Sequence, residues 1–325
     1  GSGTTTLAFS YTVQAGDTSS DLNYKATSSL ALNGGTIQDA AGNSATLTLP
    51  AVDGSDSLAG NSALVIDGSA PTVQSVSSST ADGTYKAGDV ITINVVFSEA
   101  VTVTTTGGTP QLTLETGSTD QNASYSSGSG TTTLAFSYTV QAGDTASDLN
   151  YKATSSLALN GGTIQDAAGN NATLTLPALD GSDSLAGNSA LVIDTTAPTI
   201  AITDDDADNS LSAGDTATLT FTLSEASTDF VESDVTVSGG SLSNWTAVSS
   251  TVYTTTFTPT ADSTTDGVIS VASSKFSDAA GNTNNDGSDA NNSVTFTVDT
   301  TAADTTPPTI AITDDDADNS LSAGD

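Results

Sequence analysis

The amino-acid sequence predicts an all-β fold in which Greek-key β-sandwiches follow one another in tandem. Apolar residues alternate with threonine or another polar residue at a period of two, which is typical of half-buried antiparallel strands. Asp, Gly and Asn separate these segments at short intervals, and none of the segments keeps a helical period. Long internal repeats also divide the 325 residues into units of the size of a domain.

Four segments show the alternation most clearly. In residues 91–97 and 134–140, aliphatic and aromatic side chains fall on one face of the expected strand. Residues 217–223 and 294–298 repeat the pattern further along the chain. Threonine on the other face keeps a high β propensity without exposing apolar surface to solvent. Six or seven short strands of this kind in roughly 110 residues predict an immunoglobulin-like sandwich with Greek-key connections.

The repeats predict the domain boundaries. Residues 1–67 and 128–194 have the same sequence apart from three positions, and residues 195–215 recur at 305–325 with one change. The linkers that follow each closing Asp are short and most contain proline, so they are stiffer than Gly/Ser linkers. We expect the C-terminal part of a module at 1–67, a complete module at 68–194, a complete module of a second type at 195–304 and the start of a further module at 305–325. Because two of these units are partial, we expect the chain to be a segment of a longer protein.

The charge balance restricts the partners of the chain. There are 38 acidic residues against four lysines, with no arginine and no histidine, so the net charge is −34. Nucleic-acid binding needs a basic surface that neutralises phosphates, and we therefore exclude it. Direct contact with an anionic membrane surface is disfavoured for the same reason. A chain this acidic repels itself unless cations gather on it.

Few residues are available for catalysis. Cysteine and histidine are both absent, so no disulfide bond, thiolate or catalytic triad of the usual kinds can form. Two carboxylates could cleave a glycoside, but such a site needs a cleft and aromatic platforms for the sugar. Aromatic residues make up only 5% of the chain, and we expect the single tryptophan, Trp245, to pack in the core. The sequence therefore predicts a protein that is not an enzyme.

Recurring motifs relate the chain to a known family. The motif DAAGN occurs at Asp39–Asn43, Asp166–Asn170 and Asp278–Asn282, and the joint Asp194–Thr199 reads DTTAPT. Together with the stretch Thr218–Pro259, these motifs resemble the bacterial Ig-like repeats of giant adhesins exported by type I secretion, the RTX and biofilm-associated kinds. The resemblance covers essentially the whole chain. It implies an extracellular extender region at the bacterial cell surface, which carries a remote binding domain whose ligand lies outside this chain.

Calcium is the cofactor that the sequence predicts, because Ca²⁺ takes six to eight oxygen ligands from carboxylates, amides and carbonyls. In an Ig-like module, the loops after the second and the sixth strand lie at the pole that faces the preceding module. That pole also receives the Asp that closes the last strand of the preceding module. The predicted ligands are Asp67, Glu99, Asp166 and Asn170 at one joint, and Asp194, Glu225, Asp278 and Asn282 at the next. The alternative is that these Asp and Asn residues only form turns.

A second candidate metal site lies in residues 204–215, which are similar to an EF-hand-type loop. The predicted ligands are Asp204, Asp206, Asp208 and Asp215, at positions 1, 3, 5 and 12. Position 6 is Asn209 where that loop has Gly, and position 12 is Asp where it has Glu. Asn tolerates the left-handed conformation that the turn needs. We expect this loop near Asp299, which is also a predicted metal ligand, with a copy that begins at Asp314. The alternative is a hydrated loop without a metal.

These observations predict a calcium-stiffened extender in which modules form an extended rod and contact their neighbours along the same chain. Such a region would support cell adhesion and biofilm formation from the bacterial surface. One alternative is a carbohydrate- or ice-binding module that uses the threonine runs 104–106 and 131–133. The other is a self-assembling matrix fibre, in which module edges pair between chains.

Overall fold

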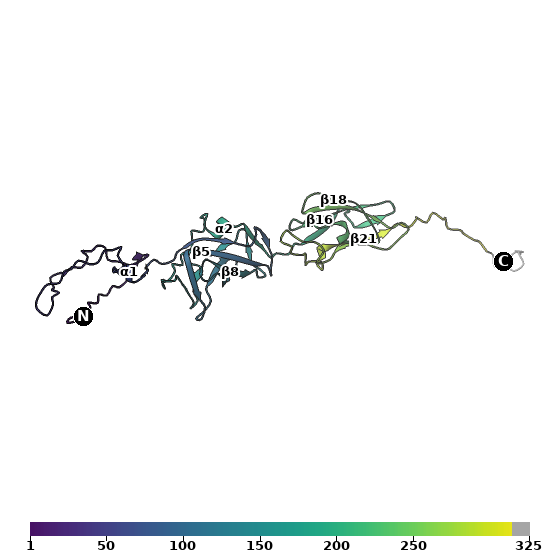
Figure 1. Ribbon diagram of the computed structural model, residues 1–325. Coiled ribbons are helices and arrows are strands. Elements are labelled where there is room, and N and C mark those ends of the chain that lie inside the picture. The colour runs from purple at the N-terminus through teal and green to yellow at the C-terminus, as the bar shows by residue number, and fades with distance from the viewer. Residues whose placement is uncertain (314–325) are drawn as a thin grey trace, which may run out of the picture. The chain divides into compact units, whose positions relative to one another are not determined.

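The computed structural model describes residues 1–313, and its contacts divide the chain into two units at Thr195 (Figure 1). The fold is all-β, as the sequence predicts, and the helical elements of the described residues are short. These are α1 (Leu58–Asn61), α2 (Leu185–Asn188), and the 3₁₀ turns η1 (Glu232–Asp234) and η2 (Ala290–Asn292). The predicted copy of the acidic loop from Asp314 lies outside the described residues.

The first unit has one apolar core, built from residues between Val76 and Ile193. Its strands are β1 (Thr18–Ser19), β2 (Ile66–Asp67), β3 (Val73–Ser78), β4 (Gly83–Tyr85), β5 (Val90–Thr104), β6 (Gln111–Glu115), β7 (Gln121–Ser127), β8 (Thr131–Thr139), β9 (Thr145–Ala146), β10 (Asn150–Tyr151), β11 (Leu157–Ala158), β12 (Thr163–Gln165) and β13 (Leu191–Asp194). The largest sheet has β5, β8, β7 and β6 as neighbours, and a small sheet has the order β4-β13-β9.

Strand β5 is the longest strand of this unit. It pairs with β8, which lies beside it in Figure 1, and with β3. After a break in register, its far end pairs with β12. Alternate residues from Ile91 to Phe97 are buried, which confirms the predicted alternation. Because β4 runs parallel to β13 while β3 pairs with β5, the first strand of the module is divided between two sheets.

The two copies of the repeated sequence differ in structure. Phe136 of β8 has no exposed surface, whereas its copy Phe9 is 76% exposed. Strand β8 lies between β5 and β7, which supply its hydrogen-bond partners from residues 90–127. Residues 4–13 have no such neighbours among the described residues, and they form no strand. A strand therefore requires partners that its own sequence does not supply.

The second unit consists of two four-stranded sheets. Its strands are β14 (Ile200–Asp204), β15 (Ser210–Ser212), β16 (Ala217–Leu223), β17 (Val235–Ser238), β18 (Gly240–Ala247), β19 (Val252–Pro259), β20 (Gly267–Val271) and β21 (Ser293–Asp299). The sheet orders are β14-β16-β19-β18 and β15-β21-β20-β17. With β14 and β15 as two halves of the first strand, this is the arrangement of an immunoglobulin-like sandwich.

Aromatic rings join the two sheets of the second unit. The rings of Phe257 in β19 and Phe296 in β21 stack with centroids 5.4 Å apart. A second group of rings surrounds Phe230, which contacts Phe221, Tyr253 and Phe276 edge to face. Trp245 also packs in this group, as the sequence predicts.

The strand count differs from the prediction of six or seven strands per module. Residues 68–194 contain β3 to β13, and residues 195–304 contain β14 to β21. Part of the excess arises because the first strand is split in both modules. The rest comes from two-residue strands between Thr145 and Ala158, where loop segments pair briefly with β6 and β13.

Candidate metal centre

Three carboxylates from distant parts of the first unit lie close together. Oxygen atoms of Asp67, Glu99 and Asp166 all lie within 4.8 Å of one another. Asp67 closes β2, Glu99 lies within β5, and Asp166 directly follows β12. Asp166 is buried, and the other two side chains are half-buried. The sequence predicts these three residues at one joint, and the structure brings all three together.

The DAAGN motif forms a closed loop that positions Asp166. The flanking residues Gln165 and Asn171 pair across the loop, and the Asp166 amide donates to the Asn170 carbonyl. In return, the Asn170 amide donates to Asp166 Oδ1 at 2.8 Å. Gly169 has a φ of 93°, a left-handed conformation that favours glycine. The motif therefore has a local structural role, whatever the carboxylate binds.

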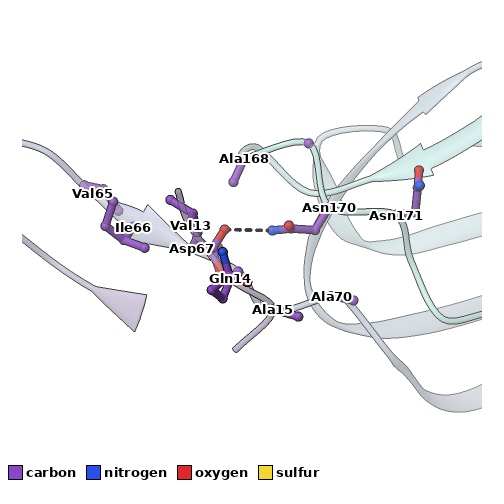
Figure 2. Close-up of a pocket in the computed structure, with 12 residues that line it drawn as sticks. Val13, Gln14, Ala15, Val65, Ile66, Asp67, Ala70, Ala168, Asn170 and Asn171 are labelled. Carbon is purple, nitrogen blue, oxygen red and sulfur yellow. Dashed lines mark hydrogen bonds between the residues drawn. The ribbon is translucent and has the colours of Figure 1, made fainter. Parts of the chain in front are cut away.

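Asn170 connects this loop to the preceding repeat. Its side-chain Nδ2 donates to Asp166 Oδ2 at 2.6 Å. The same nitrogen donates to the Asp67 carbonyl oxygen at 3.0 Å, the bond that Figure 2 shows as a dashed line. A cleft beside this contact is lined by Gln14 and Ala15 on one side and by Ala168 on the other (Figure 2). The sequence predicts Asn170 as a metal ligand. The structure gives its side-chain nitrogen a positioning role, because it donates to two of the predicted ligand residues, and its role as a ligand stays a prediction.

Backbone pairing brings Glu99 to the same place. Three residues beyond Glu99, Thr102 pairs with Gln165, the residue before Asp166. On the other side of Glu99, Ser98 exchanges hydrogen bonds with Thr72, which lies just after the linker. The position of Glu99 is therefore set by a ladder toward Asp166 and by a contact with the start of its own module.

The three carboxylates do not titrate alike. Burial raises the pKa of Glu99, and the neighbouring carboxylates of Asp67 and Asp166 raise it further. Burial acts to raise the pKa of Asp166 as well, but hydrogen bonds from Asn170, Ala168 and Gly169 outweigh it, so that this pKa is lowered. Glu99 is thus the member whose negative charge the surroundings disfavour. A cation bound by the three oxygens would reverse that effect.

In the second unit, the corresponding loops carry Glu225, Asp278 and Asn282. Glu225 follows β16, and Asp278 is buried in the connection between β20 and β21. The Asn282 amide and side chain donate to Asp278 as Asn170 donates to Asp166, at 2.9 Å in both bonds. Asp194 closes β13 in the first unit. Its predicted grouping with Glu225 and Asp278 stays a prediction.

The structure does not gather the acidic residues of 204–215 into one close group of carboxylates, and their role as metal ligands stays a prediction. Strand β15 interrupts the loop and pairs with β21, so that Asp215 lies in the next turn and accepts from the Ser212 amide. Within these residues, no three carboxylates have oxygens within 4.8 Å of one another. Asn209 does adopt the predicted left-handed conformation, with a φ of 51°. Asp206 and Asp208 both accept from the Ser210 amide, as turn-forming residues do.

Asp299, which the sequence predicts near that loop, closes β21 opposite Ser212. Its carboxylate accepts hydrogen bonds from Thr301, and these lower its pKa. The side chain therefore has a local role in starting the next linker. Sequence reasoning missed Asp229 and Ser277 entirely, since an Asp and a Ser in loops carry no signal that distinguishes them from ordinary turn residues.

The comparison with protein families agrees with this architecture. Residues 194–298 match the family model of the bacterial Ig-like domain. A bacterial Ig-like domain is typically a non-enzymatic structural module of surface or extracellular proteins, of the extender or adhesion type. None of the curated proteins compared with the chain matches it. Among the described residues, no helix is both long and apolar enough to cross a membrane.

Proposed function

We propose that the chain is a calcium-stiffened extender region of a bacterial surface adhesin, with no enzymatic activity. The observation that carries the proposal is the group of Asp67, Glu99 and Asp166, whose oxygens lie within 4.8 Å of one another. These are hard oxygen ligands of the kind that Ca²⁺ prefers, and side chains and carbonyls nearby can add to the coordination. The match of residues 194–298 to a bacterial Ig-like domain supports the extender role.

The place of the three acids explains how a cation would stiffen the chain. Asp67 belongs to the repeat that precedes the linker, and Glu99 and Asp166 belong to the module that follows it. Both ends of the linker between them are already held, because Gly68 is hydrogen-bonded to Asp17 and Thr72 is hydrogen-bonded to Ser98. A cation held from both sides would remove the remaining freedom of the joint. We extend the proposal to Asp194, Glu225 and Asp278, which occupy the same places in the order of the sequence.

Calcium would also stabilise the folded modules. A ligand that binds only the folded state adds RT ln(1 + [L]/Kd), which is about 2.7 kcal/mol when the free ligand is at a hundred times Kd. Calcium-poor cytosol would then leave the modules less stable and easier to export unfolded, in keeping with type I secretion. The absence of cysteine means that no disulfide obstructs this passage. Outside the cell, calcium would favour folding and straighten the array, as adhesion and biofilm formation require.

The internal repeat supplies a matched test of the site. Asp39 and Asp166 are copies in the same DAAGN loop with the same hydrogen bonds. Of these two residues, Asp166 lies in a group of three carboxylates and Asp39 does not. By isothermal titration with calcium, we expect Asp166→Asn to remove one binding site and Asp39→Asn to leave the number of sites unchanged. Equal effects of the two substitutions, or no calcium binding by the unmodified chain, would contradict the proposal.

A further inference from the structure

In the second unit, one carboxylate joins the two loops that carry Glu225 and Asp278. Asp229 lies on the loop after β16, four residues beyond Glu225. Its Oδ2 accepts from the hydroxyl of Ser277 at 2.5 Å, and its Oδ1 accepts from the Ser277 amide at 2.9 Å. Ser277 directly precedes Asp278 in the connection between β20 and β21. The Asp229 carboxylate therefore connects the two loops at residues adjacent to the predicted ligands.

The same carboxylate also orders its own loop. Asp229 Oδ1 accepts from the Ser227 hydroxyl at 2.7 Å, and Ser227 is buried, with its carbonyl accepting from Tyr253. Both oxygens of Asp229 are thus engaged by donors of the protein. Burial acts to raise the pKa of Asp229, but the hydrogen bonds from Ser277 and Ser227 lower it, in agreement with a charged acceptor.

A pair of aromatic rings reinforces this connection. Phe230 and Phe276, the residues next to Asp229 and Ser277, lie edge to face with ring centroids 5.2 Å apart. Both side chains are buried. An apolar contact and a charged hydrogen-bond contact thus lie side by side across the same two loops. The apolar contact does not involve the carboxylate, so replacing Asp229 with Ala would remove the hydrogen bonds of the connection without removing either ring.

In the first unit, strand pairing of the backbone brings the acids together. There, β5 continues past Glu99 and pairs with β12 up to the residue before Asp166. In the second unit, β16 ends at Leu223, before Glu225, and β20 ends at Val271, before Asp278. In the part of the chain that the structure describes, β16 and β20 belong to different sheets, and no strand pairing joins the segments that lead from them to the two acids. The contact of Asp229 with Ser277 takes the place of the missing backbone ladder.

We infer that Asp229 is a positioning residue for a cation site at Glu225 and Asp278, which it serves without coordinating the cation itself. This inference rests on the proposed calcium function. Residues that orient metal ligands through hydrogen bonds typically change metal affinity by about 10- to 100-fold when they are replaced. Asp229 would act in this way on the relative position of the two loops.

The test is a calcium titration of the full chain with Asp229→Ala and, from the other side of the contact, Ser277→Ala. We expect the Kd of one site to rise about tenfold or more, while the site at Asp67, Glu99 and Asp166 keeps its affinity as an internal reference. Asp289→Ala removes a charge from the same β20–β21 connection, where Asp289 makes no side-chain capping bond, and we expect it to change neither affinity. Asp229→Asn, which can still bond to both serines, should restore most of the affinity.

Hydrogen exchange of the calcium-free chain gives a second readout, which does not depend on metal binding. The Ser277 amide donates directly to Asp229, so we expect its exchange to accelerate in Asp229→Ala while the core strands stay protected. Calcium affinity unchanged by Asp229→Ala in a chain that binds calcium would overturn the inference. Should the unmodified chain bind no calcium, the proposed function fails, and unchanged exchange at Ser277 would then overturn the positioning role independently.

Discussion

The charge of Glu99 disfavours the folded state when no cation is bound, but the same charge would bind calcium. Burial and two neighbouring carboxylates raise its pKa, so without a cation the folded protein binds a proton at this position more tightly than the unfolded chain does. This group therefore favours folding at low pH, and its contribution turns unfavourable as the pH rises through the usual range of Glu and then through the raised pKa. At neutral pH, a bound calcium ion would offset this unfavourable negative charge.

The effect of the substitution Glu99→Gln on the Tm should therefore depend on calcium. In chelator at pH 7 we expect a higher Tm for the first unit, since a disfavoured charge is removed. In millimolar calcium we expect a smaller calcium-induced rise in Tm, because one ligand charge is lost. Scanning calorimetry with and without chelator measures both effects. A lower Tm under both conditions would indicate that Glu99 has a purely structural role.

Two buried asparagines in the connection between β20 and β21 form a contrasting pair. Asn284 is fully satisfied, because its amide accepts from Lys275 and donates to Ala272 and Asp286. Asn292 is 1% exposed, and its amide nitrogen and oxygen have no hydrogen-bond partner among the described residues. Burying a polar group without a partner costs free energy, whereas removing one half of a bonded pair leaves the other half unpaired.

We therefore expect Asn292→Leu to leave the free energy of unfolding unchanged or to raise it. Asn284→Leu should lower it by more than about 3 kcal/mol, since several buried partners lose their bonds at once. Urea unfolding, followed by the fluorescence of Trp245 in the same unit, measures both. A loss of more than about 2 kcal/mol in Asn292→Leu would show that this amide has a partner.

At the scale of the strand, the two copies of the repeat show that strand formation depends on partner strands as well as on the sequence of the strand itself. Residues 4–12 and β8 share one sequence, yet only β8 is paired on both sides and buried. The alternation predicts which side chains a strand would bury, and the structure confirms it in β5, β8, β16 and β21. It does not predict whether the partner strands are present.

This difference gives a prediction with its control inside the chain. Phe136→Ala should lower the free energy of unfolding of the first unit by about 3–5 kcal/mol, as for other buried phenylalanines. Phe9→Ala should have an effect near zero, because Phe9 is 76% exposed. Chemical denaturation of the two variants measures both changes in the free energy of unfolding. Equal losses would mean that residues 4–12 also form a buried strand in solution.

The features that could not be predicted from the sequence depend on pairing between residues far apart in the chain. The meeting of the acids at the first joint could be predicted, because strand order places Asp67 and the loop of Asp166 at one pole, but Glu99 lies within β5 and not in the predicted loop after a strand. The spacing of acids in residues 204–215 predicts a metal loop, but it does not predict that β15 lies between Asp208 and Asp215 and pairs with β21, 87 residues further along the chain. The contact of Asp229 with Ser277 likewise joins two loops that the sequence gives no reason to connect.

At the scale of the whole molecule, two modules with little sequence in common use the same plan. In both, the first strand is split between two sheets, its second half runs parallel to the last strand, and a DAAGN loop holds a buried Asp. Each module has its own apolar core. A chain built in this way can be lengthened by adding modules, which suits a spacer better than a protein with one active site.

The most direct test is small-angle X-ray scattering of residues 1–304, which include Asp67, in millimolar calcium and in chelator. We predict a larger radius of gyration and a narrower range of conformations when calcium is present, since the metal would fix the two modules end to end. Scattering curves that superimpose under the two conditions, with both modules folded, would contradict the claim that a divalent cation stiffens the joint.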